Sequence, residues 1–511
     1  MKGKLLGIFG LLIALCVVGT IASADPWYDL SSSTFLKTGN LMNLLSRTSM
    51  FGILGIGVAF VIITGGIDLS IGSTVCLSGV LLWRLLLVEY VPESQYSVMS
   101  VSSSSRTFEM ESAGVPFRPG DTLRYKGGKS DSRIYRVAGV AETEGRTIVT
   151  MEEGASRDDS GGQLIPTLKI MERIAAEGGV GPETAGSGTA GAGGTRLILE
   201  GQQSIQIRDQ LNILRAPSGM NTSTVTDVQS DENRTIVTLR DQLPSTVDTN
   251  AVAVVLHRKQ FMSVPMALLT TFSIAGLLGL IHGLLITRVR LQPFVVTLCA
   301  LLIYRGWSRW LTGDDAAGFS EYSDSLGKFG QGTLPVILRG KEVVFGIPYP
   351  MFFMVAIAIA ASILLGRTLW GRYLLALGRS ETAARFSGIN TGRVTLAAYV
   401  ICTCLAAVGG ILFSLNNNSI SPSSYGNFFE LYAIAAAVLG GCSLRGGEGS
   451  IVGVIIGTAV MQVLNNLIVL LKISDKLEFT IIGSVLLIGV TADEILKRYT
   501  AYRRLKQNAA K

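Results

Sequence analysis

The chain has 511 residues, of which 48% are hydrophobic and only 16% are charged, and its formal net charge is +7. Soluble globular proteins carry about 25% charged residues, so this composition excludes a disordered or nucleic-acid-binding chain and argues against a purely soluble enzyme. Residues 91–260 hold 18 of the 44 Lys and Arg and 21 of the 37 Asp and Glu, which leaves 26 basic against 16 acidic residues elsewhere. The basic excess therefore belongs to the apolar part of the chain, and we predict a polytopic membrane protein with a soluble insert.

Ten apolar segments are candidates to cross a bilayer, whose hydrocarbon core of about 30 Å needs roughly 20 helical residues. They cover residues 5–24, 44–64, 71–90, 262–286, 292–311, 349–366, 394–415, 429–444, 451–471 and 478–495. The first follows Lys2 and Lys4 and ends near Ala22-Ser23-Ala24, which is also the pattern of a cleavable signal peptide. We predict an uncleaved anchor, with cleavage as the alternative, and both outcomes place residue 25 outside.

Lys and Arg in the short loops predict the orientation, because cytoplasmic loops carry an excess of basic residues. With the N-terminus inside, basic residues gather in loops 287–291, 367–393 and 445–450 and in the tail after residue 495. We therefore predict a multi-pass protein of the inner (plasma) membrane with both termini in the cytoplasm. The predicted domains are helices at 1–90, an extracytoplasmic insert at 91–261, helices at 262–498 with a cytoplasmic loop at 367–393, and a basic tail at 499–511.

The insert contains an internal repeat. Residues 135–150 and 223–238 are identical at eight of sixteen positions, with a constant offset of 88. Each copy reads as two β-rich runs around a polar turn, at 142–145 and at 230–233, which is typical of a hairpin. A Gly-rich linker at 178–194 would separate two related β lobes, at 93–177 and 195–260.

The insert shows no nucleophile–base pair, metal cluster or phosphate loop, and we interpret its one histidine, His257, as structural or solvated. Two roles stay open for the insert: it docks an extracytoplasmic partner, or it is a spacer with no part in transport. The fold class that we predict is thus an all-α polytopic membrane protein of about ten transmembrane helices, some of them broken, plus an inserted soluble β-rich region of two related lobes.

The stretch from Thr64 to Ser73, TGGIDLSIGS, ends one apolar run and opens the next. Adjacent Gly65 and Gly66 followed by Asp68 indicate a broken helix, and freed backbone at membrane depth is tolerated only where protein or a water-filled path satisfies it. An ionisable group there is costly unless it is paired or hydrated, so Asp68 is a candidate for the path of a solute. The alternative is that Asp68 or Ser70 caps the following helix, and the two roles are compatible.

A second break follows the short, small-residue segment from Glu430 to Leu439, at Gly440 and Gly441. Paired glycines in two corresponding segments suggest two related halves, each with an interrupted helix, which in transporters points to the translocation path. Plain close packing of helices would use the same small residues.

A third stretch, ALGRSETAARFSGIN at 376–390, lies in the most basic predicted cytoplasmic loop. Residues 382–386 read as a short amphipathic helix that Gly388 terminates. Such a helix is a natural contact for a soluble partner, and a solvated connector is the alternative.

These stretches, together with PFVVTL at 293–298, resemble the inner-membrane permease subunits of ribose-type monosaccharide ABC importers. The resemblance covers about 340 residues, everything except the insert. It implies a ten-span fold, a permease homodimer embedded in membrane lipid, an ABC ATPase subunit and an extracytoplasmic sugar-binding protein. The translocation-path candidates, drawn from the breaks and from this resemblance, are Gly65, Gly66, Asp68, Ser70, Pro293, Thr297, Glu430, Gly440 and Gly441. The ATPase-coupling candidates are Glu381, Ala383, Ala384, Ser387 and Gly388.

Two features depart from the family pattern: Arg379-Ser380 stands where relatives have Gly-Asn, and the large insert replaces a short outer loop. The chain also lacks the phosphate-binding loop of an ATPase, and His282 stands alone among apolar neighbours, so neither an enzyme nor a cofactor is predicted. The leading hypothesis is a passive pathway for a ribose-like monosaccharide that a partner's ATP hydrolysis drives. The alternative is a degenerate permease that acts as an envelope scaffold or sensor through its β lobes.

Overall fold

The computed structural model describes residues 2–24, 29–102, 106–110, 116–127, 133–143, 146–152, 162–174, 195–200, 203–216, 219–231, 234–241, 252–323, 325–339, 342–474, 477–484, 487 and 491. The chain divides into two compact units. A helical unit comprises Met1–Leu86 and Met262–Lys511, and a β unit comprises Leu87–Phe261.

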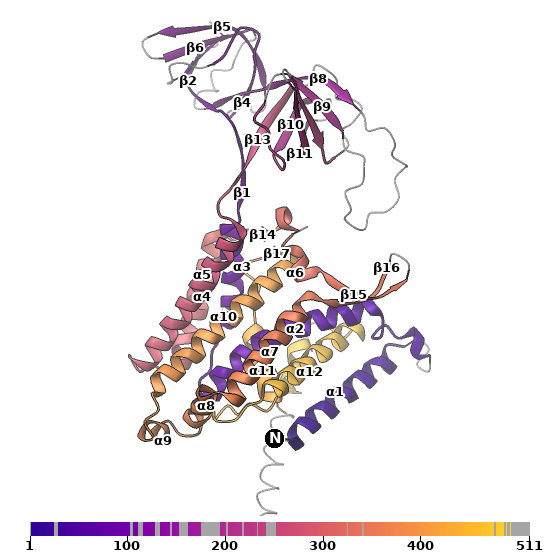
Figure 1. The fold of residues 1–511 in the computed structure, drawn as a ribbon, viewed down its shortest axis with the longest axis vertical. Coiled ribbons are helices and arrows are strands. Elements are labelled where there is room, and N and C mark those ends of the chain that lie inside the picture. Colours follow the sequence, from indigo (N-terminus) through magenta and orange to yellow (C-terminus); the bar gives the residue numbers. More distant parts are fainter. Residues whose placement is uncertain are drawn as a thin grey trace, which may run out of the picture. The chain divides into compact units, whose positions relative to one another are not determined.

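The helical unit is built from helices of very different length (Figure 1). They are α1 (Lys2–Ala22), α2 (Thr38–Ile63), α3 (Ile71–Leu85), α4 (Val264–Thr287), α5 (Pro293–Thr312), α6 (Gly327–Gln331), α7 (Tyr349–Arg367), α8 (Leu369–Arg379), α9 (Glu381–Phe386), α10 (Thr391–Asn417), α11 (Phe429–Leu439) and α12 (Ile451–Leu470). Its short strands are β14 (Ala317–Gly318), β15 (Thr333–Arg339), β16 (Glu342–Pro348) and β17 (Ser419–Ile420). Proline in the first turn of α4, α5 and α7 favours their starting points, because that position needs no amide donor.

Within the described residues, five helices are long and apolar enough to cross a membrane: α2, α4, α7, α10 and α12. Shorter apolar helices cover Leu6–Ala22, Ile71–Leu85 and Phe429–Leu439. The third predicted span, 71–90, is longer than the observed helix, because α3 ends at Leu85 and a strand begins at Val88. In a short, continuous apolar run such as the end of this span, periodicity alone does not distinguish a helix from a strand. Most of the last predicted span, 478–495, lies outside the described residues.

Helix α10 is the centre of the helical unit and packs against α4, α2 and α3 (Figure 1). Gly279 and Gly283 of α4 lie against the backbone of Val400 and Leu396, so the two helices approach closely. The second part of α2, Ser49–Ile63, is buried at every residue, whereas most residues of α4 and α7 are not buried. The first interrupted helix therefore lies in the interior of the unit.

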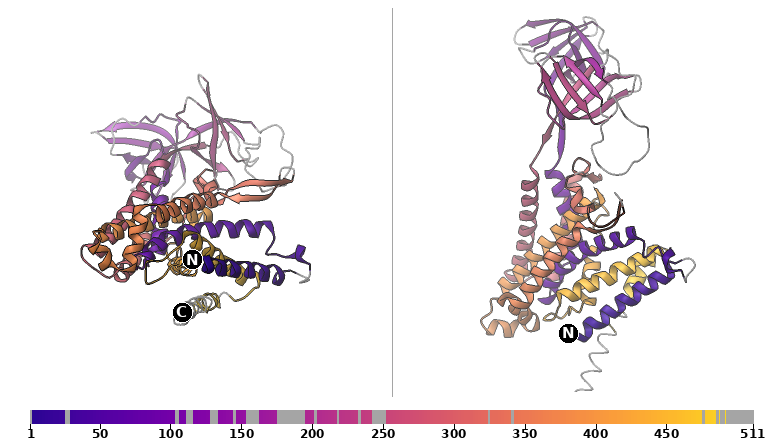
Figure 2. Two further views of the ribbon diagram at one scale, coloured as in Figure 1. Left: turned by 60° about the horizontal axis from the view of Figure 1, so that its bottom comes forward. Right: turned by 45° about the vertical axis from the view of Figure 1, so that its right-hand side comes forward.

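The β unit consists of two six-stranded barrels (Figure 2). The first contains β2 (Tyr96–Ser102), β3 (Thr107–Met110), β4 (Thr122–Lys126), β5 (Ile134–Thr143), β6 (Arg146–Met151) and β7 (Gln163–Pro166). The second contains β8 (Leu168–Ile174), β9 (Arg196–Glu200), β10 (Gln210–Ala216), β11 (Gly219–Asp231), β12 (Arg234–Leu239) and β13 (Val252–Gln260), and β1 (Val88–Pro92) adds to β13. Each barrel encloses its own apolar core.

Both barrels have the same strand order: β2-β3-β6-β5-β4-β7 in the first and β8-β9-β12-β11-β10-β13 in the second. The two repeat copies form the predicted hairpins, β5–β6 with Thr143 opposite Arg146 and β11–β12 with Asp231 opposite Arg234. Their turn residues 144–145 and 232–233 lie outside the described residues.

The equivalence extends beyond the sequence repeat. Asp121 accepts from the amide of Arg118 over 2.7 Å, and 88 residues later Asp209 accepts from the amide of Gln206 over 2.8 Å. The barrels meet at Thr167, between β7 and β8, so β8 belongs to the second barrel. The sequence-based division at 178–194 differs from this, because that segment falls between β8 and β9. It lies outside the described residues.

Candidate functional site

The first break, the loop that follows the second break and the third sequence stretch meet at one point. The amide of Gly447 donates to the carbonyl of Ile63, the last residue of α2, over 2.8 Å. Gly378 of α8 packs on the same two groups, since an added Cβ there would overlap the Ile63 oxygen and the Gly447 nitrogen. Gly446 lies against Gly378 and the amide of Gly65. We call Ile63, Gly65, Gly378, Gly446 and Gly447 the glycine junction.

Backbone conformation explains why glycine occupies this junction. Gly65, Gly446 and Gly447 have φ values of +85°, +85° and +75°, a region that costs other residues steric energy. At Gly447 a side chain would also meet Arg379, the last residue of α8. The junction therefore joins the end of α2 and the loop that follows α11 to α8, in the predicted coupling loop, through backbone contacts.

The first break runs from Thr64 to Ser70, between α2 and α3. Asp68 is fully buried, and its Oδ1 accepts from the amide of Ser70 over 2.9 Å and from its hydroxyl over 2.7 Å. Ser70 forms no side-chain cap bond to α3, so the expectation that Ser70 caps this helix is wrong, whereas Asp68 accepts from the amide of Ser70, the residue that precedes α3. The Thr297 hydroxyl of α5 lies 3.3 Å from the carbonyl of Ile67 in the break and 3.0 Å from the carbonyl of Pro293 in its own helix, and its single proton serves one of these acceptors at a time.

A side chain from the second half of the chain lies at the start of α3. The Glu430 carboxylate, in the first turn of α11, is in contact with Gly72 in the first turn of α3, since an added Cβ at Gly72 would overlap its Oε2. A carboxylate suits both positions, because helix N-termini carry free amides and partial positive charge. Arg305 of α5 holds the preceding loop by donating to the carbonyls of Pro422 and Tyr425 over 2.9 and 2.5 Å. Glu430 therefore links the two interrupted segments.

The second break differs from the first. Gly440 packs closely on Gly453 and Val454 of α12, whereas Gly441 has a φ of +92° and open space where a side chain would begin. Ser450 caps α12 by accepting from the amide of Gly453 over 3.2 Å. Close packing thus explains Gly440, and the positive φ explains Gly441.

The expectation that His282 stands alone among apolar neighbours is wrong. Its Nε2 shares a hydrogen bond of 2.8 Å with the hydroxyl of Tyr304, and the two rings stack at 5.7 Å. The two residues lie on α4 and α5, and no local sequence pattern relates residues on two different helices.

The predicted coupling element has the expected local structure. Helix α9 begins after Ser380, whose hydroxyl accepts from the amide of Ala383 over 3.2 Å, and ends near Gly388 with a φ of +80°. The departure at Arg379-Ser380 therefore provides the helix cap. Ala384 is the buried residue of α9, whereas Glu381, Ala383, Ser387 and Gly388 are exposed. Phe386, which no sequence motif singled out, is 93% exposed although its side chain is large and apolar.

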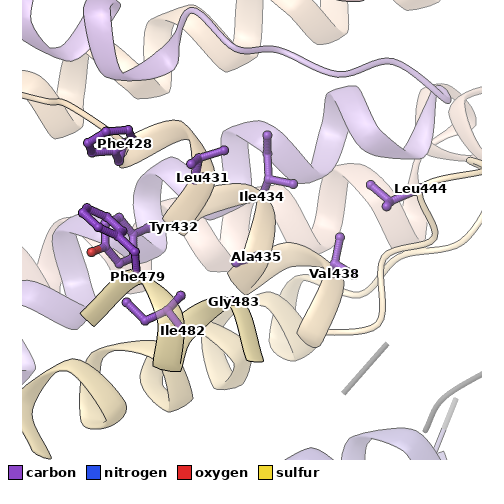
Figure 3. A pocket seen from close by; sticks show the side chains of 10 residues that line it. All are labelled: Phe428, Leu431, Tyr432, Ile434, Ala435, Val438, Leu444, Phe479, Ile482 and Gly483. Carbon is purple, nitrogen blue, oxygen red and sulfur yellow. The ribbon is translucent and has the colours of Figure 1, made fainter. Parts of the chain in front are cut away.

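The chain also contains an apolar cavity of about 350 Å³, beside α11 and residues 479–483 (Figure 3). Phe428, Leu431, Ile434, Val438 and Phe479 line it, and the hydroxyl of Tyr432 is engaged with Glu478 over 2.5 Å. Such a lining suits hydrocarbon rather than a polar solute. The predicted path residues do not line it, and among the described residues no cluster of His, Cys, Asp and Glu could hold a metal ion.

Comparisons with known proteins identify the helical unit. Residues 249–490 match the family described as branched-chain amino acid transport system / permease component. The ribose import permease protein RbsC of Escherichia coli is 35% identical over 229 residues, 44% of this chain and 68% of that protein. The galactose/methyl galactoside import permease protein MglC of Haemophilus influenzae is 30% identical over 236 residues, 45% and 67% of the two chains.

The xylose transport system permease protein XylH of Escherichia coli is 27% identical over 285 residues, 46% of this chain and 72% of that protein. No solved structure matches the chain. The match to the ribose permease covers more than two thirds of that protein, and it agrees with the apolar helices and with the motifs that the junction brings together. The chain therefore belongs to the ABC-transporter permease family, whose members are non-catalytic, multi-pass membrane components.

Proposed function

We propose that the chain forms the membrane pathway for a monosaccharide, in an importer that a separate ATPase subunit drives. An extracytoplasmic binding protein would deliver the sugar, two copies of the permease would line the pathway, and ten spans would place both termini in the cytoplasm of a cell whose inner membrane holds the complex. The relatives are permeases for ribose, galactose and xylose, as their names state, and this supports a sugar as the cargo.

The observation that carries this proposal is the glycine junction. Helix α9 presents exposed Phe386 on one side of the loop, and the other side of the loop begins at Gly378, in contact with Ile63 and Gly447. A partner that moves α9 would displace both interrupted helices through one backbone contact. Because packed interfaces respond to small shifts by switching between arrangements, this contact suits the transfer of ATPase closure to the pathway.

The test is uptake by proteoliposomes that contain the permease, the ATPase and the binding protein. Gly388 has a left-handed backbone but open space around it, so Gly388→Asn should be tolerated and Gly388→Trp should not. We expect Gly388→Trp to lower uptake per ATP hydrolysed while membrane insertion is unchanged. Equal uptake per ATP in both variants and the wild type would refute the coupling role of this loop.

A second function, an envelope scaffold or sensor, is favoured by the independence of the β unit. Its strands β1 and β13 pair from Val88–Gln260 to Pro92–Leu256, and the amide of Phe261 donates to the carbonyl of Leu87 over 3.1 Å. Deleting residues 88–260 therefore joins neighbouring ends. Retained uptake would assign transport to the helical unit alone, whereas loss of an envelope partner without a transport defect would favour the scaffold.

A further inference from the structure

Three polar atoms buried in the helical unit have no hydrogen-bond partner within the described protein. One belongs to a carboxylate, and the other two belong to side chains that interact with that carboxylate. They are Oδ2 of Asp68, Nδ1 of His282 and the hydroxyl oxygen of Tyr399. The three side chains are 0%, 1% and 0% exposed. Native proteins pair nearly all buried polar atoms, so three unpaired atoms in one place need an explanation.

Four elements bring these groups together. Asp68 belongs to the first break, His282 to α4, Tyr304 to α5 and Tyr399 to α10. The carboxylate of Asp68 interacts electrostatically with His282, Tyr304 and Tyr399, and the thiol of Cys402 lies in the same cluster. The His282 ring lies edge-to-face with the Tyr399 ring, with centroids 6.3 Å apart.

The donors and acceptors of the cluster match those that a hydroxyl group of a solute needs. Oδ2 of Asp68 accepts, the Tyr399 hydroxyl donates or accepts, and Nδ1 of His282 does either, according to which partner donates in the bond to Tyr304. A solute hydroxyl likewise donates one hydrogen bond and accepts others. The imidazole and phenol rings supply the apolar faces that a ring-shaped polyol also presents.

We propose that Asp68, His282 and Tyr399 form a binding site for the hydroxyl groups of a polyhydroxylated solute within the pathway. This inference rests on the proposed function and places a solute contact at the first break. The site is closed in this structure, since its side chains are buried. Gly66 borders it, because an added Cβ there would lie 2.6 Å from the Tyr399 hydroxyl. Movement of the break, which begins at the glycine junction, would open it.

Stability and transport should respond in opposite directions if these atoms serve binding. Removal of a buried hydroxyl that has no partner removes a desolvation cost, so Tyr399→Phe should leave the melting temperature of the detergent-solubilised protein unchanged or raise it. The matched control is Tyr425→Phe, because the Tyr425 hydroxyl is also buried without a partner among the described residues but interacts with Cys76 rather than with Asp68.

The experiment uses the full complex in proteoliposomes with tritiated D-ribose, D-xylose and D-galactose in turn. Loss of one hydrogen bond to the solute predicts a roughly 3- to 10-fold lower uptake rate for Tyr399→Phe. Asp68→Asn should also lower uptake, and Tyr425→Phe should match the wild type. For the sugar that the wild type transports, one of its monodeoxy analogues should show no further loss in Tyr399→Phe.

Each outcome is decisive. If the wild type transports a sugar and Tyr399→Phe and Asp68→Asn transport it equally well, this inference alone is overturned. If the wild-type complex transports none of the three sugars, the proposed function is refuted as well. A lowered melting temperature in Tyr399→Phe with unchanged uptake would assign the three atoms to a structural water. An equal loss of uptake in Tyr425→Phe would also overturn the site, because the effect would not depend on Asp68.

Discussion

The backbone amide of Gly447 donates to the carbonyl of Ile63, a contact that joins the loop after α11 to the end of α2. The bond satisfies one of the carbonyls that the end of a helix leaves free. Gly378 of α8 packs on both groups of this bond, so α8 contacts the end of α2 and the loop after α11 at the same point.

Substitution of Gly378 by alanine should damage this junction. The added methyl group would overlap backbone atoms of Ile63 and Gly447, which cannot rotate away as a side chain could, and overpacking of this kind costs about 1–3 kcal/mol. We expect a lower melting temperature in detergent and a lower ratio of uptake to ATP hydrolysis. Gly306→Ala in α5 is the control, since its added Cβ meets no heavy atom within 4 Å. Equal behaviour of the two variants would contradict the role of Gly378.

Phe386 should contribute to ATPase binding without contributing to the stability of the permease. At 93% exposure it buries almost nothing within the chain, yet exposed aromatic side chains are frequent anchors of interfaces. Phe386→Ser should weaken co-purification of the ATPase about 10-fold or more while the melting temperature stays the same. Phe261→Ser, at a residue that is 72% exposed and outside the coupling loop, is the matched control. Unweakened binding would exclude α9 as the contact.

Glu430 should matter for stability because it serves two helix starts. Glu430→Ala removes the carboxyl group that lies against Gly72 at the first turn of α3, and a carboxylate at a helix N-terminus contributes about 0.3–1 kcal/mol. Glu430→Gln keeps an oxygen acceptor, so we expect it to lose clearly less. Chemical denaturation followed by tryptophan fluorescence measures both. If the two variants unfold alike, the charge of Glu430 matters and its acceptor role does not.

The first barrel should lose stability in acid through Glu109. The Ser100 hydroxyl and the Arg146 guanidinium hydrogen-bond its carboxylate and lower its pKa. A carboxylate whose pKa is lower in the folded state stabilises the fold above its ordinary pKa, about 4.3, and this contribution is lost as the pH falls further. The hydrogen-exchange protection factors of residues 96–110, which correct for the slower intrinsic exchange at lower pH, should therefore fall between about pH 5 and pH 3. In Glu109→Gln the fall should be smaller, and an equal fall would refute this assignment.

Replacing the aspartate in each of the two equivalent turns should destabilise the two barrels by different amounts. Asp209 accepts from the amides of Gln206 and Arg258 and lies 2.9 Å from Nδ1 of His257, and its side chain is 3% exposed. Asp121 is exposed and has the equivalent bond to the amide of Arg118. We expect about 3 kcal/mol for Asp209→Ala and about 1 kcal/mol for Asp121→Ala. Hydrogen exchange of the strand after each turn, β10 and β4, measures the difference, and equal protection in the two variants would contradict it.

Local patterns allowed much of the architecture to be predicted. The identical Arg-Thr-Ile-Val-Thr runs indicated both hairpins, and residues 382–388 indicated α9 and its end, because turns and caps depend on neighbouring residues. The end of α3 at Leu85 and the barrel boundary at Thr167 were not predicted. In both places an apolar or β-branched run continues past the boundary. The start of β1 depends on its pairing with β13, and the assignment of β8 to the second barrel depends on its pairing with β9.

The site could be predicted only in parts. Each glycine-rich stretch was visible by itself, but the contact among Ile63, Gly378 and Gly447 depends on helix packing that no local pattern encodes. The same is true of Tyr304, Tyr399 and His282, which lie on three helices. Glu430 was expected in the path, but its contact with Gly72 could not be predicted without the fold.

The pairing of β1 with β13 has an architectural consequence. Chain entry and exit are adjacent hydrogen-bonded strands, so the double barrel occupies no more room at its attachment than an ordinary tight turn between two helices. A domain attached in this way can be gained, exchanged or trimmed during evolution while the host helices keep their register. This explains how a permease tolerates an inserted unit of this size in the middle of its sequence.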